Sequence, residues 1–541
     1  MLCRKVRLLF FFALACWQGS LHPNSLLALF ASSLLFASPA SEQPEAASTA
    51  RVHLANGQRA LEAKNVREAK AQFELAVRQD PKLAEGHLAL GILELQAGET
   101  SAAIGRFRKV VELAPELFQG HYQLAMASLR EQKIQEGAQE LERAVAINPR
   151  HADALYNLGV VLLELRRPEE ALSRLRQARE MGSKRPDIAF NIVRGELAAN
   201  RTADAHREAE KAAKTFGTDP SWRRAIGILF LQYKQPKEAI VHLAEARRLE
   251  PHSEEIRRQL ATAYLEASEA FLALPLLEPA TGAEDHYLAA SAYLVLHRPA
   301  EADRESQLAI DMEPRDPRYL LQRARIDQRV GRHAESLEHL RQASQIDPNW
   351  PEPYYSAGVT LYLLHRYADA RQNLDRALQL DPRSVRSIFL YSATLANEGK
   401  NREGEEVLLR AIALEPSNAR FYYHLGAIRL RGNRTEEAEQ AFKKAIELKP
   451  DYAPPHYQLG KLLARSDQLH LAARELETAV RYQSDLTQAY YQLARVYAQL
   501  GQKEKSEQAL SVFNQFKKEE ANPDSEFTEA VQKELQPADQ Q

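Results

Sequence analysis

The chain has 541 residues, of which 45% are hydrophobic and 27% are charged. This share of apolar residues is enough for a continuous core and excludes a disordered chain. The 71 basic and 73 acidic residues nearly cancel, and no long basic block occurs, so we expect no nucleic-acid partner.

Residues 1–40 have the composition of an export signal. The basic stretch RKVR precedes the apolar run LLFFFALA, and a second apolar run, LLALFASSLLFA, ends at the small residues of SPA. This order predicts an exported protein, cleaved after Ala40, that is periplasmic, membrane-associated or secreted. An uncleaved signal anchor and lipid attachment at Cys16 are the alternatives, and only in those cases would the segment hold the protein at a membrane.

The chain after residue 40 carries no cysteine, because Cys3 and Cys16 both lie in the export segment. Disulfides and cysteine-based metal sites are therefore excluded there. No later run is apolar and long enough to span a bilayer. We expect residues 41–50, SEQPEAASTA, to form a linker.

From residue 51 onward, the sequence repeats with a period of 34 residues, and prolines close most of the units. These prolines are Pro81, Pro115, Pro149, Pro251, Pro314, Pro348, Pro382, Pro416 and Pro450. Between Pro149 and Pro251 lie three units, two of which lack the closing proline, and the interval between Pro251 and Pro314 holds one full unit and one that is about five residues shorter. Such a period predicts an array of stacked helical repeats.

Two positions in each unit are reserved for small residues. In the first half of the unit, one position is almost always Gly, Ala or Ser, as at Gly57, Gly159 and Gly426. A matching position in the second half is also small, as at Ala69 and Ala438. Large apolar residues at i, i+3 and i+4 around these positions predict two amphipathic helices per unit. The small residues would let the two helix backbones approach closely.

The segment GNRTEE shows how the two helices of a unit are joined. Gly432 and Asn433 favour the end of a helix, and Thr435 with the two glutamates that follow suits a helix N-terminus. The closing proline of this unit, Pro450, is expected to stop the second helix.

These features resemble the tetratricopeptide repeat (TPR) family, whose pattern W-x2-L-G-x2-Y, A-x3-F-x2-A, P is matched in degenerate form by about fourteen units between residues 50 and 517. With the export segment, the chain is similar to exported bacterial members. The resemblance implies an all-α, right-handed superhelical solenoid. We expect an N-terminal array at 51–284, a C-terminal array with a capping helix at 285–519, and an acidic, partly disordered tail at 520–541.

The tryptophan of the family pattern is absent from its own position in every unit. We expect the residues that replace it to pack between helices and not to bind a ligand. They include His53, His87, His121, Tyr354, Tyr422, His456 and Tyr490.

The resemblance also implies a partner-binding groove, because members of this family bind ligands through residues of the first helices. The implied groove is mainly apolar in early units and carries aromatic and cationic residues in late ones. Its candidate residues are Leu88, Ile92, Tyr122, Met126, Tyr156, Val160, Tyr355, Arg420, Tyr423, Tyr457, Lys461, Tyr491 and Arg495. The alternative is that these side chains only pack between repeats. Of the adjacent pair, Tyr422 is expected in the packing stripe and Tyr423 in the groove.

The sequence contains no phosphate-binding loop, nucleophile elbow, zinc-protease motif or EF-hand. We therefore expect no enzymatic activity, cofactor or metal. The predicted function is a scaffold that binds a protein or peptide partner along the concave groove in the cell envelope. The alternatives are an accessory subunit acting in trans with a glycosyltransferase or sulfotransferase, and an assembly factor for a pilus, secretion or polysaccharide-export system. The partner and the oligomeric state remain open.

Overall fold

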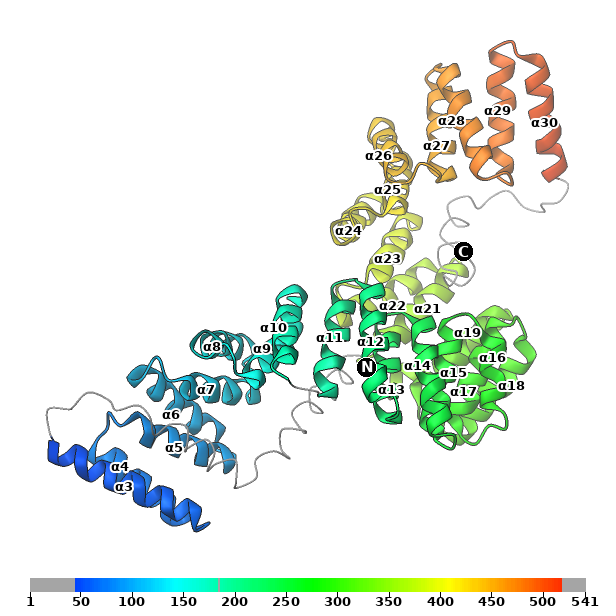
Figure 1. The fold of residues 1–541 in the computed structure, drawn as a ribbon. Coiled ribbons are helices and arrows are strands. Elements are labelled where there is room, and N and C mark those ends of the chain that lie inside the picture. Colours follow the sequence, from blue (N-terminus) through cyan, green and yellow to red (C-terminus); the bar gives the residue numbers. More distant parts are fainter. Residues whose placement is uncertain (1–43, 183–184, 518–541) are drawn as a thin grey trace. The chain divides into compact units, whose positions relative to one another are not determined.

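The structure, a computed structural model, describes residues 44–182 and 185–517 (Figure 1). Within these ranges the chain forms 28 α-helices and no strand, which confirms the expected all-α repeat solenoid. The predicted export segment and the predicted tail at 520–541 lie outside the described residues. None of the helices in the described part combines the length and the apolar character needed to cross a membrane.

The helices come in consecutive pairs, in which an odd-numbered first helix is followed by an even-numbered second helix (Figure 1). The earlier helices are α3 (Pro44–Glu62), α4 (Val66–Gln79), α5 (Ala84–Gln96), α6 (Thr100–Leu113), α7 (Phe118–Arg130), α8 (Ile134–Ile147), α9 (Ala152–Glu164), α10 (Pro168–Glu180), α11 (Pro186–Ala198), α12 (Thr202–Phe216), α13 (Pro220–Gln232) and α14 (Pro236–Leu249). The later helices are α15 (Glu254–Glu266), α16 (Ala270–Leu277), α17 (Ala283–Val295), α18 (Pro299–Met312), α19 (Pro317–Arg329), α20 (His333–Ile346), α21 (Pro351–Leu363), α22 (Tyr367–Leu380), α23 (Val385–Asn397), α24 (Asn401–Leu414), α25 (Ala419–Arg431), α26 (Thr435–Leu448), α27 (Ala453–Arg465), α28 (Leu469–Tyr482), α29 (Thr487–Gln499) and α30 (Lys503–Lys517).

Two compact units divide the described residues, one up to His252 and the other from Ser253 onward. The array boundary expected between residues 284 and 285 lies inside the second unit, at the start of α17. The short repeat α15–α16 packs against α17, so its contacts place it with the repeats that follow.

Helix α3 begins at Pro44, inside the segment expected to be a linker. Its Ala50 is completely buried in a cluster with Ala76 and Leu83. The alanines of this segment favour a helix, and packing against α4 holds the helix in place.

The small residues of the first helices lie directly against the second helix of the same repeat. A Cβ atom added at Gly426 would lie 2.5 Å from the ring of Phe442, and one added at Gly159 would lie 2.6 Å from Leu175. Such contacts are too short for carbon atoms, so a larger residue would push the two helices apart. The predicted role of the small positions is confirmed.

Each pair of helices is joined by a tight turn with one residue in the left-handed backbone region. At Asn433 φ is 59°, and the N–H of the next residue, Arg434, bonds to the carbonyl of Arg429 at 2.9 Å, as in a Schellman motif. The equivalent residues with positive φ are Lys64, Gly98, Gln132, Arg166, Asn200, Lys234, Ser268, His297, Gly331, His365, Gly399, Asp467 and Gly501. The turn geometry is therefore the same in every described repeat, whichever residue occupies it.

Candidate partner-binding surface

Two of the residues that replace the family tryptophan, His456 and His121, contact polar groups of their own repeat and of the preceding one. His456 Nδ1 lies 2.6 Å from Glu475 Oε2 on the second helix of its repeat, and Nε2 lies 2.9 Å from the carbonyl of Pro450, which closes the preceding repeat. His121 contacts Glu140 and the carbonyl of Pro115 in the same way, at 2.6 and 2.8 Å. Since His121 and His456 are buried, the prediction that this column packs between helices is confirmed for them.

The partners of His456 are both acceptors, so the ring must donate from both nitrogens to satisfy them. Burial opposes the charged imidazolium, but the hydrogen bonds to Glu475 and to the Pro450 carbonyl raise the pKa of His456. The proton on this ring therefore has a structural role.

The adjacent residues Tyr422 and Tyr423 do not lie as expected. Tyr423 is only 4% exposed, and its ring packs at 6.0 Å from that of Phe442 and at 5.6 Å from that of Tyr452, which begins the next repeat. Tyr422 is partly exposed, and its hydroxyl donates to the carbonyl of Pro416 at 3.2 Å. The expectation that Tyr423 faces an open groove is therefore wrong, because the neighbouring repeat covers it.

Among the early candidates, Leu88, Ile92 and Tyr156 are buried, with 5–7% of each residue exposed. The ring of Tyr156 also lies under the guanidinium of Arg185, 4.8 Å from its centroid. These three residues serve packing, as the alternative interpretation expected.

The remaining early candidates, Tyr122, Met126 and Val160, stay partly exposed on α7 and α9. Asn157 connects two of them, because its amide nitrogen donates to the Tyr122 hydroxyl at 3.0 Å and lies 3.5 Å from the Met126 sulfur. Burial and the nearby Asp153 raise the pKa of Tyr122, so its hydroxyl stays neutral and protonated. We call Tyr122, Met126, Asn157 and Val160 the α7–α9 surface.

Among the late candidates, Tyr355 is partly exposed and lies under Arg386, whose guanidinium is 4.5 Å from the ring centroid. Arg386 is itself paired with Glu352. Burial raises the pKa of Tyr355. Arg420 is also partly exposed, at the start of α25. This part of the surface is occupied by contacts between repeats.

An aromatic ring lies beside a cation in each of the last two first helices, α27 and α29. Tyr457 is buried, with the ammonium of Lys461 5.0 Å from its ring centroid. Tyr491 remains 42% exposed and has Arg495, also exposed, at 6.0 Å. The ring of Phe513 on α30 lies 5.2 Å from the ring of Tyr491, measured between centroids.

One recurring position of the first helices, occupied by Asn or Gln, was not recognised from the sequence. Asn157 and Asn191 each lie two residues before the small position of their first helix, and each donates to the tyrosine hydroxyl of the preceding repeat. Gln322 occupies the same position and donates to the carbonyl of Tyr287 at 2.8 Å. The recurrence of Asn and Gln at one place in the repeat was the signal that could have revealed them.

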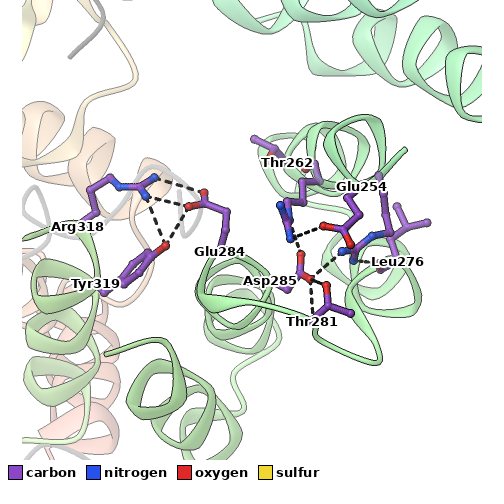
Figure 2. Close-up of polar contacts among 10 residues, drawn as sticks. Glu254, Thr262, Leu276, Thr281, Glu284, Asp285, Arg318 and Tyr319 are labelled. Carbon is purple, nitrogen blue, oxygen red and sulfur yellow. Dashed lines mark hydrogen bonds and ion pairs between the residues drawn. The ribbon is translucent and has the colours of Figure 1, made fainter. Parts of the chain in front are cut away.

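A second set of polar residues joins three consecutive first helices, α15, α17 and α19 (Figure 2). Asp285 is completely buried and accepts hydrogen bonds from Arg257 and Arg258, each at 2.7 Å. It also accepts from the Thr281 backbone N–H at 3.0 Å and from its hydroxyl at 2.8 Å. Burial opposes its charge, but these bonds hold the pKa of Asp285 well below its usual range.

The preceding residue, Glu284, points the other way and contacts α19 (Figure 2). It accepts from Arg318 at 2.9 Å and from the Tyr319 hydroxyl at 3.1 Å. Two adjacent carboxylates therefore tie α17 to both of its neighbours. With its acceptors occupied by these internal donors, this set stabilises the array and does not form a ligand site. Throughout the described ranges, no group of three or more ligating side chains is placed to hold a metal ion.

Comparison with known proteins identifies the repeats. Models described as tetratricopeptide repeat match residues 54–117, 122–186 and 394–453, and another of the same description matches 487–511. A search of curated proteins finds no match.

Similar solved structures include the Cut9–Hcn1 hetero-tetramer of the APC/C, at 14% identity and a TM-score of 0.40, covering 83% of this chain and 97% of that chain. Yeast Tom70 is similar at 17% identity and a TM-score of 0.36, covering 84% of this chain and 95% of that chain. MamA from Desulfovibrio magneticus RS-1 is similar at 22% identity and a TM-score of 0.30, covering 31% of this chain and 95% of that chain.

Proposed function

We propose, from the tetratricopeptide repeats present in both units of the chain, that the protein is a non-catalytic scaffold that binds a polypeptide partner along its first helices in the cell envelope. Repeat arrays of this kind present an extended surface to a partner, and adjacent first helices contribute to it together.

The α7–α9 surface is the observation that carries this proposal. Tyr122, Met126 and Val160 offer apolar area that is not fully buried, and two of them are held in position by Asn157. Burial of about 100 Å² of apolar area would contribute roughly 2.5 kcal/mol to binding. Methionine adapts its shape to different apolar side chains, and the Tyr122 hydroxyl adds a polar group that can orient the partner.

The last repeats offer a second candidate surface with a different chemistry. Tyr491 and Arg495 place an exposed aromatic ring beside an exposed cation, which suits an acidic side chain or a carboxylate flanked by apolar groups. A partner segment bound at α7 and α9 would be apolar, and a segment bound at α29 would be acidic.

The test uses a photo-crosslinking residue in place of Met126 to capture the partner in intact cells, followed by co-purification with substituted chains. The double variant Met126→Glu and Val160→Glu should reduce recovery of that partner by at least about tenfold, because two carboxylates would have to be buried.

The matched control is Arg143→Glu, which makes the same change in net charge on the second helix α8, where this side chain is 64% exposed. It should retain the partner. Equal recovery with both variants would contradict binding on the first helices.

The envelope location is tested separately on the mature protein. If residues 1–40 are an export signal, intact mass measurement should find a chain that begins at Ser41 in the envelope fraction. A chain that retains Met1 and fractionates with cytosolic proteins would contradict this location.

A further inference from the structure

A cavity of about 310 Å³ opens between the second helices α20 and α22, above the first helix α21. Its floor is apolar and includes Leu340, Ala357 and Leu361. Its mouth is polar and is lined by Arg341, Arg366, Asp369, Gln372 and Asn373.

The first cause of the cavity is an alanine in place of a leucine. Ala357 lies one residue before the small position of α21, at Gly358. Most other repeats place a branched aliphatic residue there: Leu90, Leu124, Leu158, Ile192, Ile226, Leu260, Leu425, Leu459 and Leu493. The side chain that normally fills this space from inside the repeat is therefore missing in α21.

The second cause is a serine in place of another aliphatic residue. Ser344, on α20, also lines the cavity, and its hydroxyl bonds to the carbonyl of Arg341 at 2.8 Å. Eight other repeats place a branched aliphatic residue at the equivalent position: Val77, Val111, Val145, Ile310, Leu378, Ile412, Ile446 and Val480. Two small residues therefore meet at a place where six other junctions between repeats hold two branched aliphatic residues.

The hydrophobic core beside the cavity contains few residues. Its buried cluster holds only four residues, Leu321, Ala324, Leu340 and Ala357, with Leu337 and Trp350 packed against them. Leu361, at the floor of the cavity, belongs instead to the larger buried cluster of the next repeats.

The charged side chains at the mouth already have ion-pair partners. Arg366 contacts Asp369 at 2.6 Å, and Arg341 contacts Glu338 at 2.6 Å. The amide of Asn373 donates to the carbonyl of Asp369 at 3.0 Å. An ionic ligand would have to break these pairs, whereas a neutral apolar group could enter between them.

We propose that this cavity is a binding site for a leucine-type side chain of a partner polypeptide. The space has the chemistry of the residues that other repeats place there, so branched hydrocarbon supplied from outside restores the missing packing. The exposed amide of Gln372 at the mouth can bond to the backbone that carries the side chain.

This inference rests on the proposed function only in taking the partner to be a polypeptide. The cavity opens between second helices, and the proposed groove follows the first helices, so either site can fail alone. A small probe separates them, because it requires no knowledge of the partner.

The experiment titrates the full chain, labelled at leucine methyl groups, with N-acetyl-leucinamide and follows the signals of Leu337, Leu340 and Leu361 by NMR. N-acetyl-glycinamide has the same backbone groups and no side chain. At equal concentration the leucine compound should shift these signals at least about tenfold more, in keeping with burial of one aliphatic side chain.

The double variant Ala357→Leu and Ser344→Ile restores the residues of the other repeats and fills the cavity. It should lose the response to N-acetyl-leucinamide and unfold at a higher temperature than the original chain. Gln345→Ile adds the same hydrocarbon at an exposed position of α20 and should keep the response. The proposal is overturned if the original chain shows no preference for the leucine compound, or if the filled variant still responds.

Discussion

Asn157 on α9 donates a hydrogen bond of 3.0 Å to the hydroxyl of Tyr122 on α7 and so joins two consecutive first helices. Asn191 and Tyr156 repeat this relationship at 3.3 Å between α11 and α9. Side-chain hydrogen bonds therefore add to apolar packing between these repeats. Such contacts between nearest neighbours determine the stability of a repeat array.

Replacing Asn157 by Ala should loosen α7 against α9. The change removes the donor to the Tyr122 hydroxyl at a partly exposed position, at a cost of about 0.5–1.5 kcal/mol. Amide hydrogen exchange should become faster in α7 and α9 and stay unchanged two repeats away. Tyr122→Phe removes the same bond from the other side, so the double variant Asn157→Ala with Tyr122→Phe should cost less than the sum of the two single variants. Additive costs would contradict the explanation.

Replacing Glu475 by Gln should lower the pKa of His456. In the folded chain this pKa is raised, so the contribution of His456 to stability is fully present below its unfolded pKa of about 6.5 and is lost as the pH rises through the folded pKa. NMR titration of the ring signals measures the shift directly. Glu447→Gln, at an exposed glutamate of α26, is the control and should leave the titration unchanged.

His242 should have the opposite effect on stability. It is fully buried on α14, stacked on Phe230 at 5.6 Å, and its pKa is lowered to about 4 by burial and by Arg223. The contribution of neutral His242 to the free energy of unfolding is therefore fully present above pH 6.5. It is lost as the pH falls toward 4, and the total loss is about 3 kcal/mol.

The measurement for His242 is the free energy of unfolding in urea between pH 7 and pH 4. His242→Gln should lose less stability over this range than the original chain, because glutamine does not titrate. His252→Gln removes an exposed histidine and should follow the original chain. If His242→Gln and the original chain lose the same free energy, the assignment is wrong.

Replacing Gln132 by Gly should stabilise the turn between α7 and α8. Gln132 has a φ of 62°, a left-handed conformation that costs a residue with a side chain about 1 kcal/mol relative to glycine. We expect a gain of about 0.5–1 kcal/mol in thermal unfolding, reduced by the greater freedom of glycine in the unfolded chain. Gly98→Ala, at the equivalent turn with a φ of 84°, should destabilise by a similar amount.

Periodic patterns predicted the helices and turns well, because they express contacts within one repeat. Gly426 against Phe442 and Asn433 in the turn were both recognisable from the sequence for this reason. The exposure of groove residues was predicted less well. Tyr423 and Tyr457 are covered by neighbouring side chains, and the conformations of those side chains cannot be read from an alignment of the repeats.

The sequence by itself determined the period, the pairing of helices and the positions that must stay small, since each depends on residues a few turns apart on amphipathic helices. Only the tertiary structure decided which surfaces remain open. In the structure Tyr452 covers Tyr423, Met126 is partly exposed, and Ala357 and Ser344 line a cavity. The physical reason is that a residue is exposed only where no neighbouring repeat packs over it. Its exposure therefore depends on the three-dimensional position of every adjoining side chain.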